Sequence, residues 1–510
     1  MNRREFLSTP LFAAAAQADS GASLSFKAGF AEADITPEIG MEQPGGYGKS
    51  RHTKFHDPCK ARVAVFDDGR SRVALVGLDA LAVPRSLVLE ARKAIEQQCG
   101  IRGEAVLISA SHSHSSGPLF GVMPGQYDHA SPLVRRLAYE MSTCADPRYM
   151  DRVREQIVAA VAKADRLRAE AASAVASGFE NTVAFNRRHR MKNGLTYTHP
   201  GQGNPDMLGY AGPTDPEVGV LASWDKSGKL LGCVVNFACH ATTSPGGISA
   251  NWIYYLEKTI RGVMGPDVIV VFLQGACGDV TQVNNLSPYR NPGGEQWAWL
   301  VGGRVGAEAA KVLLGMYPGA LAPVTASSKV MRIKRRAPSE EKVRLASALV
   351  QKDPKEVGAA RWTFAKETVM LAALLEKEPQ VDVEVQAVQV GPAVYVSNPA
   401  ELFCQYGLDI KSRSPFKYTF PVELANGCVG YVPTEEALGP HGGGYETRLT
   451  SYSNLEPGAG RQMVEAGLEL AGKMQPGAAP EPPKAPPFSS DESGIGAHPW
   501  SYGNVPPELS

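Results

Sequence analysis

Hydrophobic residues in this chain fall into short apolar runs, separated by segments in which apolar positions recur with a helical period. Short apolar runs bounded by Gly, Pro or Asp predict buried strands, and the periodic segments predict amphipathic helices. The predicted strands occupy residues 24–36, 61–66, 73–78, 105–110, 175–185, 218–225, 230–240, 268–273, 324–334, 381–390, 393–396 and 418–424. The predicted helices occupy residues 86–98, 149–174, 254–263, 295–314, 402–411 and 457–474. This order predicts an α/β fold with a mixed β-sheet core and flanking helices.

The apolar run 105–110 has the most informative ending. It continues into Ser111-His112-Ser113-His114 and is stopped by Gly117-Pro118. If the extended conformation persists to His114, both imidazoles point to the same side, because side chains alternate along a strand. Two histidines on one face can share a metal, or one can bind it while the other carries protons. The alternative is a polar strand end that faces solvent.

The same ending recurs, because several predicted strands stop at residues with reactive side chains: Asp79, His112 with His114, His240, Asp279 and Glu401. In sheets with parallel strands, sites form outside the carboxyl ends of the strands, so we expect one shared pocket there. His112, His240 and Glu401 are the natural ligands for zinc, and three protein ligands leave room for a water molecule. We expect Asp79 and Asp279 to support the ligands or to cap turns.

The two ends of the chain differ from the central region. Twin arginines precede Phe6-Leu7 and a modest apolar stretch of small residues, so residues 1–20 predict a twin-arginine-type export signal. Residues 475–510 are rich in Pro, Ser and Gly and predict an extended tail. We expect one domain over residues 24–474, with a polar helical hairpin on its surface at 338–378. Export would place the protein in the periplasm or outside the cell.

Composition narrows the function classes further. Lys and Arg together number 52, as do Asp and Glu, so the formal net charge of zero gives no basic footprint for nucleic acid. The basic cluster 334–336 is expected to be a solvated strand end. The 8 cysteines are widely spaced without a CxxC pair, which disfavours a cysteine zinc site. An oxidising compartment would permit one or two disulfides. We expect Cys277 to be a small buried side chain.

Several segments together resemble the neutral ceramidase family. Ser111–Pro118 resembles the T-H-T-H-S-G-P segment of these enzymes, with one extra serine. The other matching segments follow in the family's order and are Asp34–Thr36, Asn186-Arg187, Asn236–His240, Gln274–Asp279, Asn398–Glu401, Tyr431–Thr434 and Tyr445-Glu446. As a set they cover roughly residues 24–460 and are specific.

The resemblance implies a zinc-dependent hydrolase of sphingolipid metabolism that cleaves an N-acyl amide bond with zinc-activated water. It implies that zinc is held by His112, His240, Glu401 and Tyr431. It also implies that three further residues surround the scissile carbonyl, namely His114, Arg187 and Tyr445. The substrate would be a small acyl amide or a lipid, reached with peripheral membrane contact.

Two departures from the family pattern keep other functions open. Gly275 stands where the family turn has a serine, and Pro399-Ala400-Glu401-Leu402 replaces the G-E-P motif. The alternatives within enzymes are a zinc esterase, a lactonase or a deacetylase acting on another acyl compound. The alternative of another class is an inactive family member that binds a lipid or a glycan.

Overall fold

The computed structural model describes residues 26–485. The export signal predicted at residues 1–20 lies outside this range, as does the tail beyond residue 485. The described part of the tail, residues 475–485, contains neither helix nor strand. Among the described helices, none has both the length and the apolar character that crossing a bilayer requires.

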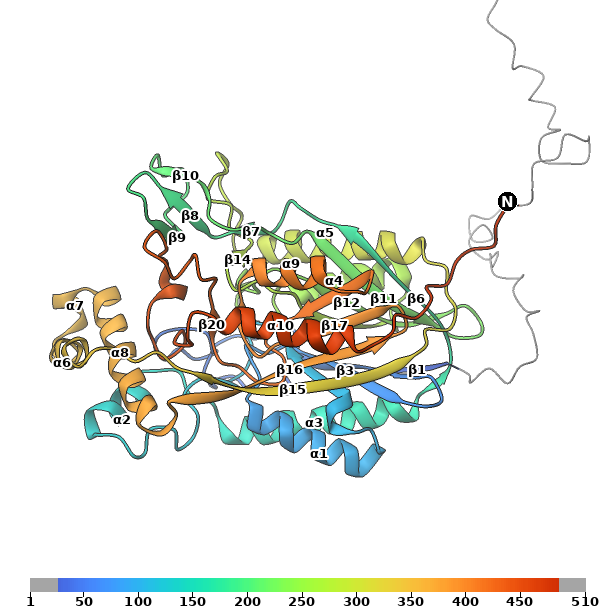
Figure 1. Ribbon diagram of the computed structural model, residues 1–510, viewed down its shortest axis with the longest axis horizontal. Helices are drawn as coiled ribbons and strands as arrows, with labels where there is room; N and C mark the ends of the chain where they lie inside the picture. The colour runs from blue at the N-terminus through green and yellow to red at the C-terminus, as the bar shows by residue number, and fades with distance from the viewer. Residues whose placement is uncertain (1–25, 486–510) are drawn as a thin grey trace, which may run out of the picture.

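Two β-sheets pack face to face in the centre of the molecule (Figure 1). The first has the order β4-β3-β2-β1-β5, formed by Val106–Ala110, Arg72–Leu78, Lys60–Asp67, Lys27–Asp34 and Ala169–Glu170. The second has the order β13-β12-β11-β6, formed by Ile269–Gln274, Leu230–Phe237, Glu217–Trp224 and Ala172–Phe179. Both are mixed sheets, since β3 and β4 run parallel and so do β12 and β13. The predicted α/β class with mixed sheets and flanking helices is therefore confirmed.

Helices cover the outer faces of this pair of sheets. α1 (Arg85–Cys99) and α3 (Pro147–Arg166) lie over the first sheet, and α4 (Trp252–Met264) and α5 (Gly294–Leu314) lie over the second (Figure 1). Each presents an apolar stripe inward; on α3 the stripe includes Tyr149, Val153 and Ile157. The layers bury their apolar faces against one another, which is how such a domain forms a core.

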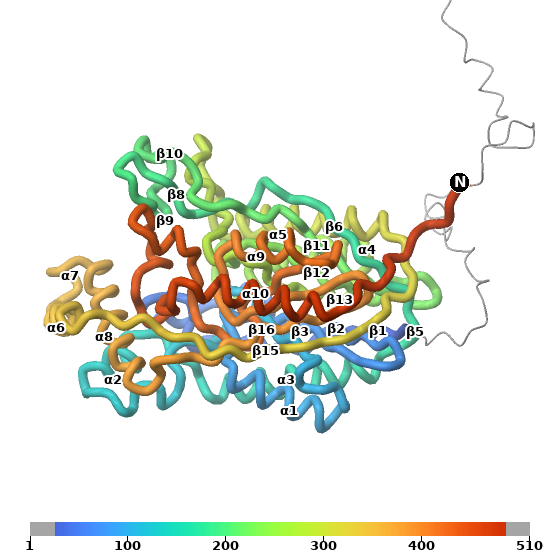
Figure 2. Tube along the Cα trace, in the orientation of Figure 1, coloured from blue at the N-terminus to red at the C-terminus, as the bar shows by residue number. Residues whose placement is uncertain are grey.

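A third sheet runs lengthwise across the middle of the view in Figure 2, where its strands are yellow and orange. Its order is β15-β16-β17-β19, formed by Val324–Lys334, Gln380–Val390, Ala393–Ser397 and Tyr418–Val422. α9 (Cys404–Arg413) and α10 (Ala459–Gly472) pack on it. The smaller sheets are β18-β20 (Glu401–Leu402 and Tyr431–Val432), β14-β7 (Val280–Thr281 and Phe185–Asn186) and β10-β8-β9 (Met207–Tyr210, Arg188–Met191 and Thr196–Thr198).

The segment 338–378 is helical as predicted, but it does not lie wholly on the surface. It forms α6 (Glu340–Leu349), the short α7 (Pro354–Val357) and α8 (Ala359–Lys377). However, ten residues of α8 are buried, and this helix packs against α2 (Pro132–Tyr139), which the sequence did not predict. The apolar run 369–375 lies between the polar ends of the segment and is the sequence signal that this helix is buried.

The sequence permitted one or two disulfides, but the described residues contain none. All 8 cysteines are free thiols, and five of them are fully buried. They serve as small apolar side chains of the core. Cys277 is one of the buried five, as expected.

Candidate active site

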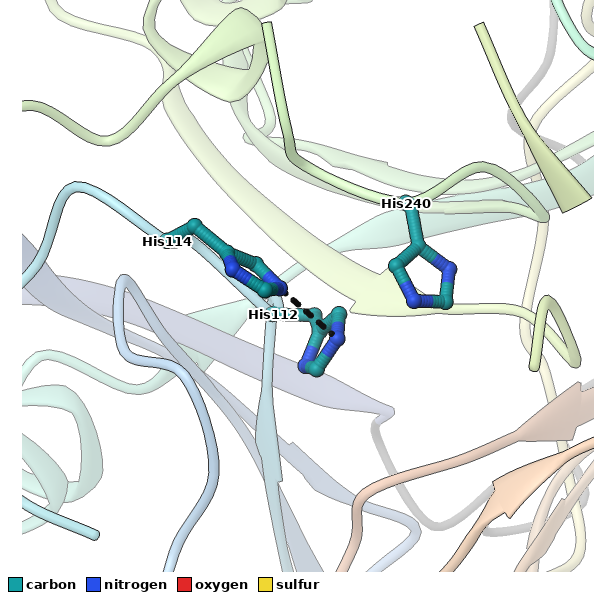
Figure 3. A group of neighbouring side chains, drawn as sticks. All are labelled: His112, His114 and His240. Carbon is teal, nitrogen blue, oxygen red and sulfur yellow. Dashed lines mark hydrogen bonds between the residues drawn. The ribbon is translucent and has the colours of Figure 1, made fainter. Parts of the chain in front are cut away.

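Three histidines meet where β4 and β12 end. His112 and His114 follow β4, and His240 follows β12 (Figure 3). The ring centroids of His112 and His240 are 4.5 Å apart, and those of His112 and His114 are 4.7 Å apart. The ligand nitrogens of all three lie within 4.8 Å of one another, so the group could hold a metal ion.

The local backbone at these histidines is not the predicted extended strand. β4 ends at Ala110, and His112 has a φ of 64°, in the left-handed region. Strand alternation therefore does not bring the two rings together. The turn itself does so, and places the Nε2 atoms of His112 and His114 3.2 Å apart. A non-glycine residue with this backbone conformation is uncommon and is often found at functional sites.

Glu401 belongs to a third segment of the chain and lies beside these histidines. Its Oε2 atom lies 3.2 Å from Nε2 of His112 and 3.3 Å from Nε2 of His240. Glu401 begins β18 and pairs in parallel register with Tyr431 of β20, which brings the predicted fourth ligand beside it. The residues named as zinc ligands therefore come together from segments that are far apart in the sequence.

Backbone carbonyls fix the orientation of the two most buried rings. Nδ1 of His112 donates to the carbonyl of Leu81 at 2.9 Å, and Nδ1 of His240 donates to the carbonyl of Cys277 at 2.8 Å. Because Nδ1 carries the proton, the Nε2 lone pair of each ring faces Glu401. Such a bond to the distal nitrogen is the usual support of a histidine ligand.

Charge and burial set the protonation states of this cluster. Burial, together with neighbouring Arg187 and His112, lowers the pKa of His240 to about 3. Burial also holds the pKa of His114 well below its usual value. Burial opposes the ionisation of Glu401, but a proton shared with His112 or His240 outweighs it and holds the pKa of Glu401 well below the usual range. Neutral imidazoles beside an ionised carboxylate are the states that metal binding requires.

Two observations indicate that the donor atoms of this cluster fit a zinc ion. In a tetrahedral site with bonds of about 2.0–2.1 Å, neighbouring donor atoms lie about 3.3 Å apart. The separations at Glu401 match this value. In addition, Nε2 of His240 and Oε2 of Glu401 are buried and have no hydrogen-bond partner in the described part of the chain. Buried polar atoms are normally paired, so two orphans that face each other indicate a shared ligand.

Arg187 and the two tyrosines form the next layer. Nη2 of Arg187 donates to the hydroxyl of Tyr431 at 3.2 Å and to the carbonyl of Gly278 at 2.7 Å, and its Nε donates to Glu446 at 2.7 Å. Its guanidinium lies 5.1 Å from the ring centre of Tyr445 and 5.6 Å from that of Tyr431. Arg187 is 3% exposed and is not among the residues that line the pocket, whereas both tyrosines are.

A pocket of about 480 Å³ opens onto the cluster. His112, His114, Glu401, Tyr431 and Tyr445 are among the residues that line it. The wall contains apolar side chains from two regions and a buried polar group, namely Phe120, Val122, Met370, Leu374 and Lys366. The volume is in the range of small-molecule sites.

The contribution of α8 to this wall was not predicted from the sequence, and the prediction for Arg335 was wrong. Lys366, 1% exposed in its side chain, donates to the carbonyl of Tyr47 at 2.5 Å and to Oγ of Ser142 at 2.7 Å. Arg335, expected in a solvated strand end, instead lines the pocket with a side chain that is 8% exposed. The error arose because a run of basic residues does not reveal which side chain turns inward.

Not every predicted strand end reaches the pocket. Asp79 pairs with Arg62 at 2.6 Å, away from the histidines. Asp279 accepts from the backbone of Cys404 at 2.8 Å and from Asn186 at 2.8 Å. These contacts reach none of the predicted metal ligands, and neither aspartate lines the pocket, so the idea that all the strand endings share one pocket is too broad.

Gly275, the departure from the family serine, lies directly against the end of β12. A Cβ atom at this position would stand 3.0 Å from Ala238 Cβ and from Ala238 N. Contacts of this length are tighter than ordinary van der Waals contacts, so β12 leaves little room for any side chain at this turn.

Comparison with known proteins agrees with the motifs. A neutral ceramidase from Pseudomonas aeruginosa is 24% identical over 285 residues, which cover 53% of this chain and 39% of that protein. The match thus spans about two-fifths of the relative's length. No protein-family model matches the chain.

The fold has solved counterparts. The crystal structure of the neutral ceramidase from Pseudomonas aeruginosa superimposes with a TM-score of 0.64 and 19% identity, covering 90% of this chain and 77% of that one. A ceramidase complexed with C2 superimposes with a TM-score of 0.65 and 18% identity, with the same coverage. Sequence and fold together therefore confirm the resemblance of this chain to the neutral ceramidase family.

Proposed function

We propose that this protein is a zinc-dependent hydrolase that cleaves the amide bond of an N-acyl lipid of the ceramide type. The observation that carries the proposal is the convergence of His112 Nε2 and His240 Nε2 on one oxygen of Glu401 at the base of a pocket. The likeness to neutral ceramidases supports the reaction class.

In this proposal His112, His240, Glu401 and Tyr431 hold the zinc ion. When bound, zinc would act as a Lewis acid towards the scissile carbonyl and would lower the pKa of water to about 7. His114, neutral and facing the pocket, can take a proton from the attacking water and pass it to the leaving amine. Tyr445, held by Arg187, can donate to the oxyanion that develops on the carbonyl oxygen.

The pocket supports a substrate with one apolar arm. Phe120, Val122, Met370 and Leu374 offer an apolar surface next to the histidines, suited to an acyl chain. We further propose that the protein is exported and acts in sphingolipid metabolism at a membrane surface.

The first test is metal content with matched variants. Purified protein should contain about one zinc per chain, and His112→Ala and His240→Ala should lose both metal and fatty acid release from ceramide. His441→Ala is the control, because His441 lies in an exposed loop and its side chain bonds only to the carbonyl of Gly194 among the described hydrogen-bond partners. Wild-type protein without zinc, or His112→Ala with unchanged activity, would overturn the metalloenzyme proposal.

The second test separates the substrates. Purified enzyme is offered ceramide, short acyl esters, lactones and N-acetyl sugars at equal concentrations. We expect the highest kcat/KM for ceramide. Preference for an ester, a lactone or an acetyl sugar would redirect the proposal to the zinc esterase, lactonase or deacetylase alternatives. Binding of lipid or glycan without turnover would support an inactive binding protein.

A further inference from the structure

Glu423 is a fully buried carboxyl group behind the metal cluster. It follows β19 and its side chain is 0% exposed. Its Oε2 accepts from the backbone N–H of Leu402 at 2.8 Å, and its Oε1 accepts from the thiol of Cys277 at 2.9 Å. Glu423 lies in none of the family motifs, and only the fold brings its partners together.

The backbone of Glu423 makes two further contacts of the same kind. Its N–H donates to the carbonyl of Gln274 at 2.9 Å, at the end of β13. Its carbonyl accepts from Oγ of Ser109 in β4 at 3.0 Å. Hydrogen bonds of this one residue therefore connect it to three other segments of the chain.

Each of these connections leads to a residue that would hold the metal. Leu402 directly follows Glu401, so its N–H bond fixes the peptide next to the ligand carboxylate. Cys277 supplies the carbonyl that orients Nδ1 of His240, and its sulfur lies 3.4 Å from that same nitrogen. Ser109 is in the strand that leads to His112. Glu423 thus contacts the supports of His240 and Glu401 without reaching the pocket.

Hydrogen bonds, and not an ion pair, hold the carboxyl group of Glu423. Within residues 26–485, no Lys, Arg or His lies within ion-pair distance of its carboxyl group. Instead, Nε2 of Gln274 donates to the same Cys277 sulfur at 2.8 Å and to the carbonyl of Cys239 at 2.8 Å. Glu423, Cys277 and Gln274 form a buried polar cluster, which we call the support cluster.

We infer that Glu423 is a positioning residue, which holds His240 and Glu401 in the geometry that zinc binding needs. The inference rests on the proposed function, since it assigns a role toward the proposed metal. Residues that support metal ligands in this way change metal affinity by about 10- to 100-fold when they are removed.

The test measures zinc affinity by competition with a chromophoric chelator. Glu423→Leu removes both acceptors and should weaken zinc binding about 10- to 100-fold. Glu423→Gln keeps an acceptor for Leu402 and a polar contact for Cys277, so it should restore most of that affinity. The absorption spectrum of the cobalt-substituted protein should change in Glu423→Leu and resemble wild type in Glu423→Gln.

Gln389→Leu is the control for a general loss of stability. Gln389 is also 0% exposed, and it bonds to the carbonyls of Gly391 and Gln475, in the third sheet and away from the histidines. It should lower the unfolding midpoint while leaving zinc affinity and the cobalt spectrum unchanged. If Glu423→Leu does not fold, Cys277→Ala replaces it and should weaken zinc binding in the same direction.

The outcomes separate the two proposals. Equal zinc affinity in wild type and in folded Glu423→Leu or Cys277→Ala would overturn the role of Glu423 and leave the proposed hydrolase intact. An equal loss of affinity in Gln389→Leu would also overturn it, because the effect would then be unspecific. A wild-type protein that binds no zinc would overturn both.

Discussion

His114 has two candidate roles, as a metal ligand and as a group that transfers protons. Its Nε2 lies 3.2 Å from Nε2 of His112, close enough to share a metal, yet its ring also lines the pocket. The resemblance to neutral ceramidases assigns His114 to the substrate, whereas geometry alone groups it with the two ligand histidines.

Replacing His114 separates these two roles. We expect His114→Gln to keep the zinc content of wild type and to lower kcat by about 10²- to 10⁴-fold, because only proton transfer is lost. Metal analysis and steady-state kinetics on the same preparation check this. A variant that loses its zinc together with its activity would make His114 a ligand.

Gly45 controls the position of the same imidazole. A Cβ atom on Gly45 would stand 2.3 Å from Nδ1 of His114, so Gly45→Ala must displace the ring. We expect kcat to fall by about 10- to 100-fold, since small displacements of a catalytic group have effects of this size.

Gly40→Ala is the matched control for this change. Gly40 has a φ of 92° and Gly45 a φ of 86°, so both substitutions introduce similar backbone strain, but a Cβ on Gly40 meets no atom within 4 Å. Both variants should lose about 1 kcal/mol of stability. Only Gly45→Ala should lose activity, and equal kcat values in the two variants would contradict the prediction.

At the scale of single elements, α8 shapes the substrate wall. Leu374 and Leu371 are both buried in this helix, 3% and 0% exposed, but only Leu374 is among the pocket-lining residues. Either Leu→Ala change should cost about 2–5 kcal/mol of stability through the cavity it creates. Leu374→Ala should also shift kcat/KM towards bulkier acyl chains.

Leu371→Ala should leave that preference unchanged, since its cavity opens into the helix packing and not into the pocket. A ceramide series of increasing acyl length, assayed with both variants, measures the difference. Identical chain-length profiles would exclude α8 as a determinant of the substrate.

At the scale of the whole molecule, a buried ionic network joins the layers. Glu257 on α4 pairs with Arg62 and Lys60 on β2 and with Arg261 on its own helix. Burial alone would raise the pKa of Glu257, but these three cations outweigh it and lower that pKa to about 2. Since the pKa is depressed on folding, ionised Glu257 stabilises the protein above its unfolded pKa, about 4.3, and this contribution is lost as the pH falls towards 2.

Glu257→Gln should therefore destabilise the protein at pH 7 and less near pH 3, because part of the contribution is already lost there. Urea unfolding of wild type and variant at both pH values checks this, because the difference between their free energies of unfolding isolates the ionised carboxylate. An equal difference at the two pH values would show that the packing of Glu257, and not its charge, matters.

The elements of the fold were largely predictable because their signals are local. β15 was predicted with its observed bounds, and the apolar runs that became β2, β3 and β13 were recognised within a residue or two. The predicted helix 149–174 was too long, because its last residues pair with β11 as part of β6. Small sheets such as β8-β9-β10 were missed, since short polar strands carry no periodic signal.

By itself, the sequence determined which residues have ligand chemistry and that they follow buried strands, because apolar runs and side-chain types are properties of neighbouring residues. Only the tertiary structure decided which strand ends meet. Asp79 turns to Arg62 while Glu401 reaches His112, and α8 closes the pocket wall. Glu423 contacts Leu402 and Cys277, which adjoin the proposed ligands Glu401 and His240. These contacts join segments up to several hundred residues apart, and they depend on how the sheets pair and pack.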